Sequence, residues 1–164
     1  MLSRRSFLRA SLTLAVVPPL GVVLPSGAAQ PTKRLVIVTQ KSNALVELSL
    51  RDLKHMYLSE QVDGPGGRLI PLQQAAGSPV REAFERLVLK MSPDEVGRFW
   101  IDRKIRGQKG APKAVAPVEL LRRVIVSLPN TVTYLNATDL TDDLKVLKVE
   151  GQGPQDPGYL LQFD

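Results

Sequence analysis

The spacing of apolar residues near the start of the chain predicts a strand followed by a helix. Arg34–Thr39 is an apolar run rich in β-branched residues, which is typical of a buried strand. Gln40–Asn43 is a polar break. In Leu50–Leu58 the apolar residues stand at positions 50, 53, 56 and 57. This spacing predicts a helix, with Ser49 as its N-cap.

The next segment predicts a turn and a short strand. Asp63–Gly67 contains three glycines and a proline, a composition typical of a turn. Arg68–Leu72 then predicts a strand. Because Pro71 has no N–H to donate, it indicates an edge position or an irregular ladder.

Three further helices are predicted from their first residues and their apolar stripes. Ser78 and Pro79 begin the first helix, and Ser92 begins the second with Glu95 at capping-box spacing. The third helix spans Pro117–Leu128. The side chains expected to face the core are Val80, Phe84, Leu87, Val88 and Met91, then Val96, Phe99, Trp100 and the stem of Arg103, then Val118, Leu121, Val124, Ile125 and Leu128.

Two alternating segments complete the pattern. Thr131–Leu135 and Leu144–Val149 alternate as strands do, and Gly151–Asp164 is rich in glycine and proline and is expected to lie on the surface. The predicted order is strand, helix, strand, three helices and two strands. This order predicts a single α/β domain with a mixed sheet flanked by helices.

The first residues of the chain predict an export signal. The adjacent pair Arg4–Arg5 and Arg9 form a basic region, and the apolar stretch Ser11–Leu24 follows it. Small residues at positions 26–29 fit a cleavage site. We therefore expect residues 1–29 to be a twin-arginine (Tat) signal peptide and residues 30–164 to be the periplasmic domain.

Removal of this signal changes what the charge implies. The whole chain has a formal net charge of +6, and loss of the three arginines in residues 1–29 lowers it to +3. This is weak support for a nucleic-acid partner, and no such partner is expected. The chain has no cysteine and one histidine, His55, which is expected to be a surface or half-buried helical residue. Neither a metal site nor a cofactor is predicted.

The strongest candidate for a binding site is the start of the first of the three later helices. There, Gly77 permits close approach, Ser78 offers a hydroxyl, and the amides of Val80 and Arg81 are free to bind an anion. Pro79 has no N–H, so one donor of such a site is missing. The alternative is that Ser78 caps its own helix and has no further role.

Few residues suit catalysis, and we do not expect an enzyme. The carboxylate pairs Glu82/Glu85 and Asp94/Glu95 are expected on helix surfaces. A local basic patch is formed by Lys104, Arg106, Lys109 and Lys113 together with Arg103. It is either a solvated loop or a surface that attracts an anionic ligand or an acidic partner.

From residue 34 to about residue 150 the order of motifs resembles the phosphate ABC transporter substrate-binding protein family, in its short single-lobe members. The segments that carry the resemblance are Ala44–Leu53, Tyr57–Ser59, Asp63–Gly64, Leu69–Leu72, Gly77–Phe84, Trp100 and Gly107–Pro112. Two features depart from the family pattern. A tryptophan before the Asp63–Gly64 turn is missing, and Pro129–Tyr134 retains only the proline and tyrosine of a glycine-containing motif.

This resemblance implies one lobe of a type 2 periplasmic binding protein-like fold. It also implies that Ser78 corresponds to the serine that contacts phosphate in the family. A single lobe would offer an open half-site with weak affinity for phosphate or a similar oxyanion. The alternative is a protein–protein interaction module that has lost its ligand and serves a membrane transporter or sensor complex.

Overall fold

The computed structural model describes residues 33–164, so the expected signal at residues 1–29 lies outside the described residues. Along the chain the helices and strands are β1 (Lys33–Gln40), β2 (Glu47–Leu48), α1 (Leu50–Tyr57), β3 (Asp63–Gly64), β4 (Gly67–Arg68), β5 (Ile70–Gln73), α2 (Pro79–Phe84), η1 (Glu85–Leu89), α3 (Pro93–Ile105), β6 (Lys113–Ala114), α4 (Val118–Ser127), β7 (Thr131–Asn136), η2 (Ala137–Asp139), β8 (Leu144–Val149) and β9 (Gln162–Phe163). Among these residues no helix is long and apolar enough to cross a membrane.

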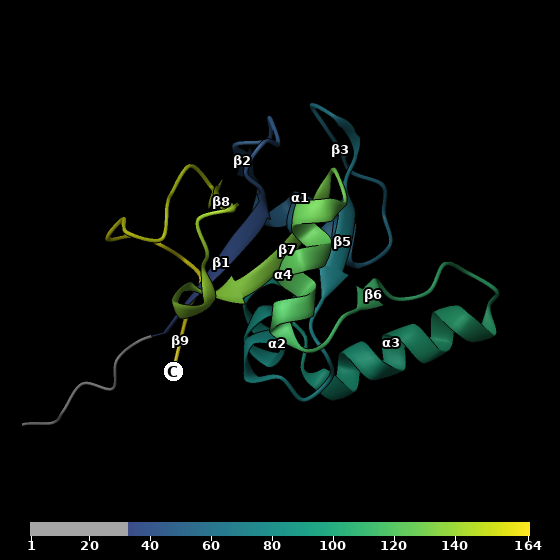
Figure 1. The fold of residues 1–164 in the computed structure, drawn as a ribbon. Helices are drawn as coiled ribbons and strands as arrows, with labels where there is room; N and C mark the ends of the chain where they lie inside the picture. Colours follow the sequence, from purple (N-terminus) through teal and green to yellow (C-terminus); the bar gives the residue numbers. More distant parts are fainter. Residues whose placement is uncertain (1–32) are drawn as a thin grey trace, which may run out of the picture.

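The strands form a mixed seven-stranded sheet, with a separate hairpin of β3 and β4 (Figure 1). The main sheet has the order β2-β8-β1-β7-β5-β6, and β9 pairs with the first residues of β1. The β1 strand is antiparallel to β7, β8 and β9, whereas β5 is parallel to both of its neighbours. The predicted mixed α/β fold is confirmed.

The central strand β1 is buried on both faces, which explains why its sequence has no polar break. Leu35 and Ile37 point into one hydrophobic core, and Val36 and Val38 point into a second core on the opposite face of the sheet. All four side chains are fully buried. Helices α1 and α2 with η1 cover the first face, and α4 covers the second, so the sheet is the middle of three layers.

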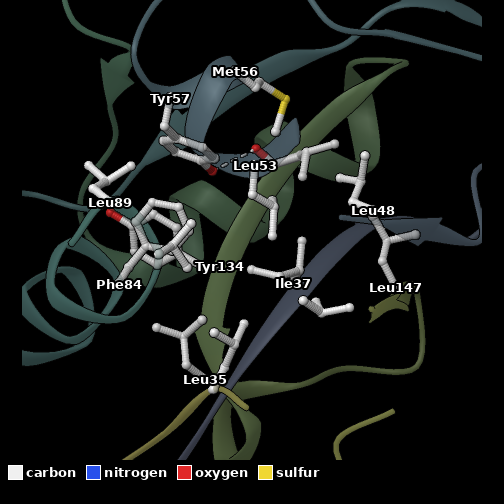
Figure 2. Close-up of a cluster of buried hydrophobic side chains, with 14 of the residues drawn as sticks. Leu35, Ile37, Leu48, Leu53, Met56, Tyr57, Phe84, Leu89, Tyr134 and Leu147 are labelled. Atoms are coloured by element: carbon white, nitrogen blue, oxygen red, sulfur yellow. Dashed lines mark hydrogen bonds between the residues drawn. The ribbon is translucent and has the colours of Figure 1, made fainter. Parts of the chain in front are cut away.

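An aromatic cluster lies at the centre of the larger core (Figure 2). The rings of Phe84 and Tyr134 are stacked with centroids 4.1 Å apart, and Tyr57 packs against Phe84 at 4.5 Å. The Tyr57 hydroxyl donates to the carbonyl of Leu72 at 2.8 Å. Burial raises the pKa of both Tyr57 and Tyr134, so these hydroxyls stay protonated and stabilise the core as neutral groups.

The helix caps at the starts of α1 and α3 form as the sequence predicts. Ser49 accepts a hydrogen bond from the Asp52 amide at the start of α1. Ser92 and Glu95 form the predicted capping box of α3, and the hydrogen bonds from Ser92 to the Glu95 carboxylate lower its pKa. Both confirmed caps fix where a helix leaves the preceding loop.

The prediction that the C-terminal segment lies on the surface is wrong. Tyr159, Leu161 and Phe163 are buried in the larger core, and the Tyr159 hydroxyl donates to the carbonyl of Leu35 at 2.8 Å. Burial raises the pKa of Tyr159 to about 12. Because β9 pairs beside β1, the apolar residues of this segment alternate inward despite its glycines and prolines.

The structure also refines three smaller expectations. Leu128 follows the end of α4 in extended conformation and is 48% exposed, so it lies outside the helical stripe. In β7 both faces are buried, and Thr131 and Thr133 satisfy their hydroxyls by donating to carbonyls of Leu128 and Leu72. The third concerns β5. Of the two alternatives indicated by Pro71, the edge position is wrong, because β5 has β7 on one side and β6 on the other, while β6 pairs only with Leu72 and Gln73 and leaves the ladder incomplete beside Pro71.

Candidate functional site

The candidate site lies where the chain passes from β5 into α2. Beyond Gln73 the chain turns, and the amide of Ser78 donates to the carbonyl of Ala75 at 3.3 Å. Gly77 has a φ of +79°, a backbone conformation that side chains with a Cβ rarely adopt. Ser78 is extended, and Pro79 opens the helix. This turn therefore places the first residues of α2 beyond the end of a buried strand.

The Ser78 hydroxyl does not cap its own helix, which corrects the simpler of the two sequence interpretations. It donates instead to Oε1 of Gln74 at 2.6 Å. The Gln74 side chain is buried, and its Nε2 donates to the carbonyl of Tyr134 at 3.2 Å, which holds Oε1 toward Ser78. The amides of Val80 and Arg81 consequently donate no hydrogen bond to the Ser78 side chain.

Arg81 is held by two groups of the protein itself. Its Nε donates to Oε1 of Glu85 at 2.8 Å, and its Nη1 donates to the carbonyl of Gln74 at 3.0 Å. The Arg81 side chain is 14% exposed and that of Glu85 is 4% exposed. The positive charge at the start of α2 is therefore neutralised by an almost fully buried carboxylate.

The buried position of Glu85 corrects its prediction as a helix-surface residue. Glu85 stands four residues after Arg81, where two side chains on a helix face each other. At this point α2 changes into the wider turn η1, whose buried residues are Glu85, Val88 and Leu89. The carboxylate enters the protein interior because Arg81 provides both its counter-charge and a hydrogen bond.

The structure brings together only part of the predicted set. Ser78 and Arg81 both contact Gln74, which the sequence reasoning left without a role. Gly77 is exposed and Val80 is half-buried against the larger core. The spacing of Arg81 and Glu85 was a signal for their ion pair, whereas the contact with Gln74 depends on the turn.

The candidate site lies apart from four hollows on the described residues. Four hollows on the described part of the molecule have volumes of about 260 to 520 Å³, and none includes Gly77, Ser78, Val80 or Arg81 in its lining. The start of α2 therefore lies outside these four hollows.

Other candidate residues lie apart from this site. Nδ1 of His55 is 3.0 Å from Oε2 of Glu60, and the imidazole is about one-third exposed, as expected. In residues 33–164 no group of three or more acidic, histidine or cysteine side chains is placed to hold a metal ion. The basic residues Lys104, Arg106, Lys109 and Lys113 are exposed around the end of α3 and the following loop.

Comparison with solved structures identifies several proteins with a similar fold. A phosphate ABC transporter substrate-binding protein with bound phosphate from Clostridium perfringens matches 75% of this chain with a TM-score of 0.61 and 16% identity. An ABC-type phosphate transport receptor from Vibrio cholerae matches 75% with a TM-score of 0.60 and 16% identity. PstS from Borrelia burgdorferi matches 80% with a TM-score of 0.59 and 12% identity.

These matches cover 47%, 48% and 55% of those three chains, so this chain spans about half of their length. No protein-family model and no curated protein matches the sequence. At such low identity the similarity shows the fold alone. The described domain is a single lobe of a periplasmic binding protein-like fold.

Proposed function

We propose that the chain is an exported, single-lobe binding domain that holds phosphate or a similar small oxyanion weakly at the start of α2. The observation that carries this proposal is the uncapped N-terminus of α2. Because the Ser78 hydroxyl is directed to Gln74, the amides of Val80 and Arg81 have no side-chain partner from the cap. Such amides and the helix dipole favour an anion.

The neighbouring folds support the choice of oxyanion. The proteins from Clostridium perfringens and Vibrio cholerae are described as phosphate transport proteins, and the first of them was solved with phosphate bound. The half-length match supports a weak site, because one lobe can contact only one side of the ligand. A periplasmic location through a Tat signal at residues 1–29 is part of the same proposal.

The Arg81–Glu85 pair limits how the anion would be held. The guanidinium already binds a carboxylate and a carbonyl, so the proposed contacts are the backbone amides and the Ser78 hydroxyl, which would exchange its hydrogen bond to Gln74 for one to the anion. Arg81 would add a partly neutralised positive charge behind them. This arrangement favours a weakly held, exchangeable ligand.

Phosphate is expected to raise the melting temperature of the exported domain. At tenfold excess over its Kd a ligand stabilises the folded state by about 1.4 kcal/mol, which corresponds to a shift of a few degrees. The Ser78→Ala variant should reduce this shift because it removes a donor. The Pro79→Ala variant should increase it because it restores a backbone amide. Melting is measured by circular dichroism in phosphate and in chloride of equal ionic strength.

Ser127→Ala is the matched control, since Ser127 is an exposed hydroxyl on α4 that bonds only the Arg123 carbonyl of its own helix. Its response to phosphate should equal that of the wild type. An absent shift at about 10 mM phosphate, or equal shifts in all four proteins, would contradict the oxyanion proposal.

A second candidate function is an interaction module for a membrane transporter or sensor complex. The internal pairing of Arg81 with Glu85 and the missing amide of Pro79 favour this alternative. Capture of partners from periplasm with and without phosphate separates the two functions. A partner bound equally in both conditions, together with no phosphate-induced stabilisation, would favour the interaction module.

A further inference from the structure

Helix α3 has apolar side chains on two opposite faces. At about 100° per residue, Val96, Phe99 and Trp100 share one side of the helix, and Ile101 and Ile105 share the other. Val96 is buried and Trp100 packs against the larger core. In contrast, Ile101 is 60% exposed and Ile105 is 80% exposed. The packing of the domain therefore accounts for only one apolar face of α3.

The exposed face lies on a projecting part of the molecule. In Figure 1, α3 extends away from the sheet, and the loop from its C-terminal end returns to β6. Val96 is the only fully buried residue of the helix, and it lies in the first turn. The last two turns can therefore approach a broad surface without interference from the rest of the domain.

Basic side chains surround the two isoleucines. On the helix, Lys104 flanks the pair on one side and Arg98 on the other, and Lys109 follows in the loop. All three are exposed. The nearby carboxylate of Asp102 is already paired with Arg106 at 3.1 Å. We call Arg98, Ile101, Lys104, Ile105 and Lys109 the α3 tip surface. Its three charged members are positive, and the nearest exposed carboxylate on the same side of the helix is Asp94, two turns before Ile101.

We propose that the α3 tip surface binds the headgroup layer of a bilayer that contains anionic phospholipids. Exposed apolar side chains beside lysine and arginine are one feature of helices that lie in a membrane interface. The two isoleucines would enter the boundary between headgroups and acyl chains, while the lysines and the arginine contact phosphates. The helical members of this surface line none of the four hollows, although Lys109 borders one of them, and a projecting helix suits a broad lipid surface better than an inserted peptide.

The proposal is independent of the oxyanion site. Its residues stand on α3 and the following loop, whereas the proposed phosphate contacts stand at the start of α2. Each can fail without the other. With two inserted isoleucines and few cations, binding is expected to be reversible and sensitive to ionic strength.

Co-sedimentation with lipid vesicles tests the proposal. The exported protein is purified from the periplasm, and its N-terminus is checked by mass spectrometry so that an apolar leader does not cause binding. We expect binding to phosphatidylglycerol/phosphatidylcholine vesicles and little binding to phosphatidylcholine alone. The Ile101→Ser/Ile105→Ser variant, which keeps every charge, should reduce binding about tenfold or more. The Lys104→Gln/Lys109→Gln variant should also weaken binding and make it less dependent on salt.

Val46→Ser is the matched control, because Val46 is 61% exposed but lies outside α3. It should bind as the wild type does. All substituted side chains are exposed, and circular dichroism verifies that each variant is folded. The proposal is overturned if anionic vesicles do not bind the wild type, or if the isoleucine variant binds equally well. It is also overturned if α3 binds an acidic protein but no vesicle.

Discussion

Replacing Glu85 by alanine is expected to lower the free energy of unfolding by about 3–5 kcal/mol, one of the two largest effects predicted for this domain. The substitution leaves the guanidinium of Arg81, only 14% exposed, without its carboxylate. A buried charge that loses its partner keeps its desolvation cost but loses the attraction that offset it. Urea unfolding followed by circular dichroism measures the change.

Two further variants show whether loss of the Arg81–Glu85 ion pair causes the lower free energy of unfolding. Glu82→Ala removes a half-buried carboxylate from the same helix and is expected to cost less than about 1 kcal/mol. The double variant Arg81→Met/Glu85→Leu removes both charges and should recover most of the lost stability. A loss below about 1 kcal/mol for Glu85→Ala would show that Arg81 does not depend on Glu85.

Replacing Tyr159 by alanine is expected to cost about 3–5 kcal/mol, although Tyr159 lies in a segment whose composition resembles a loop. The side chain is 3% exposed and packs in the larger core, and its hydroxyl donates to the Leu35 carbonyl on the central strand. The substitution leaves a cavity beside β1 and an unpaired carbonyl. Urea unfolding of the variant measures this loss.

The neighbouring residue provides the control. Leu160 is 51% exposed, so Leu160→Ala is expected to change stability by about 0.5 kcal/mol or less. Tyr159→Phe keeps the ring and loses only the hydroxyl, and it should cost about 1 kcal/mol. If Tyr159→Ala and Leu160→Ala were equally stable, the C-terminal segment would not belong to the core.

The sequence predicted the elements whose signals are local. The apolar run of β1 and the capping box of α3 depend on neighbouring residues, and both are confirmed. β9 has only two residues and forms because it pairs with Lys33 and Arg34, more than a hundred positions away. No local pattern can reveal a partner so distant, so the glycines and prolines before β9 dominated the prediction.

The candidate site likewise contains one part that local residues predict and another that depends on distant partners. A helix start after Gly77 could be predicted because Ser78 and Pro79 are local signals. The direction of the Ser78 hydroxyl could not, because it depends on Gln74, which is held by the Tyr134 carbonyl of another strand. The burial of Glu85 likewise depends on the layer into which η1 packs.

The most direct test of the oxyanion site is a phosphate titration of the nitrogen-15-labelled domain, followed by NMR at each backbone amide. We expect the largest changes at Val80 and Arg81. The start of α4 is an internal control, because its N-cap, Pro117, also provides no side-chain hydrogen bond. Unchanged amides at Val80 and Arg81, or equal changes at the starts of α2 and α4, would contradict a site built at α2.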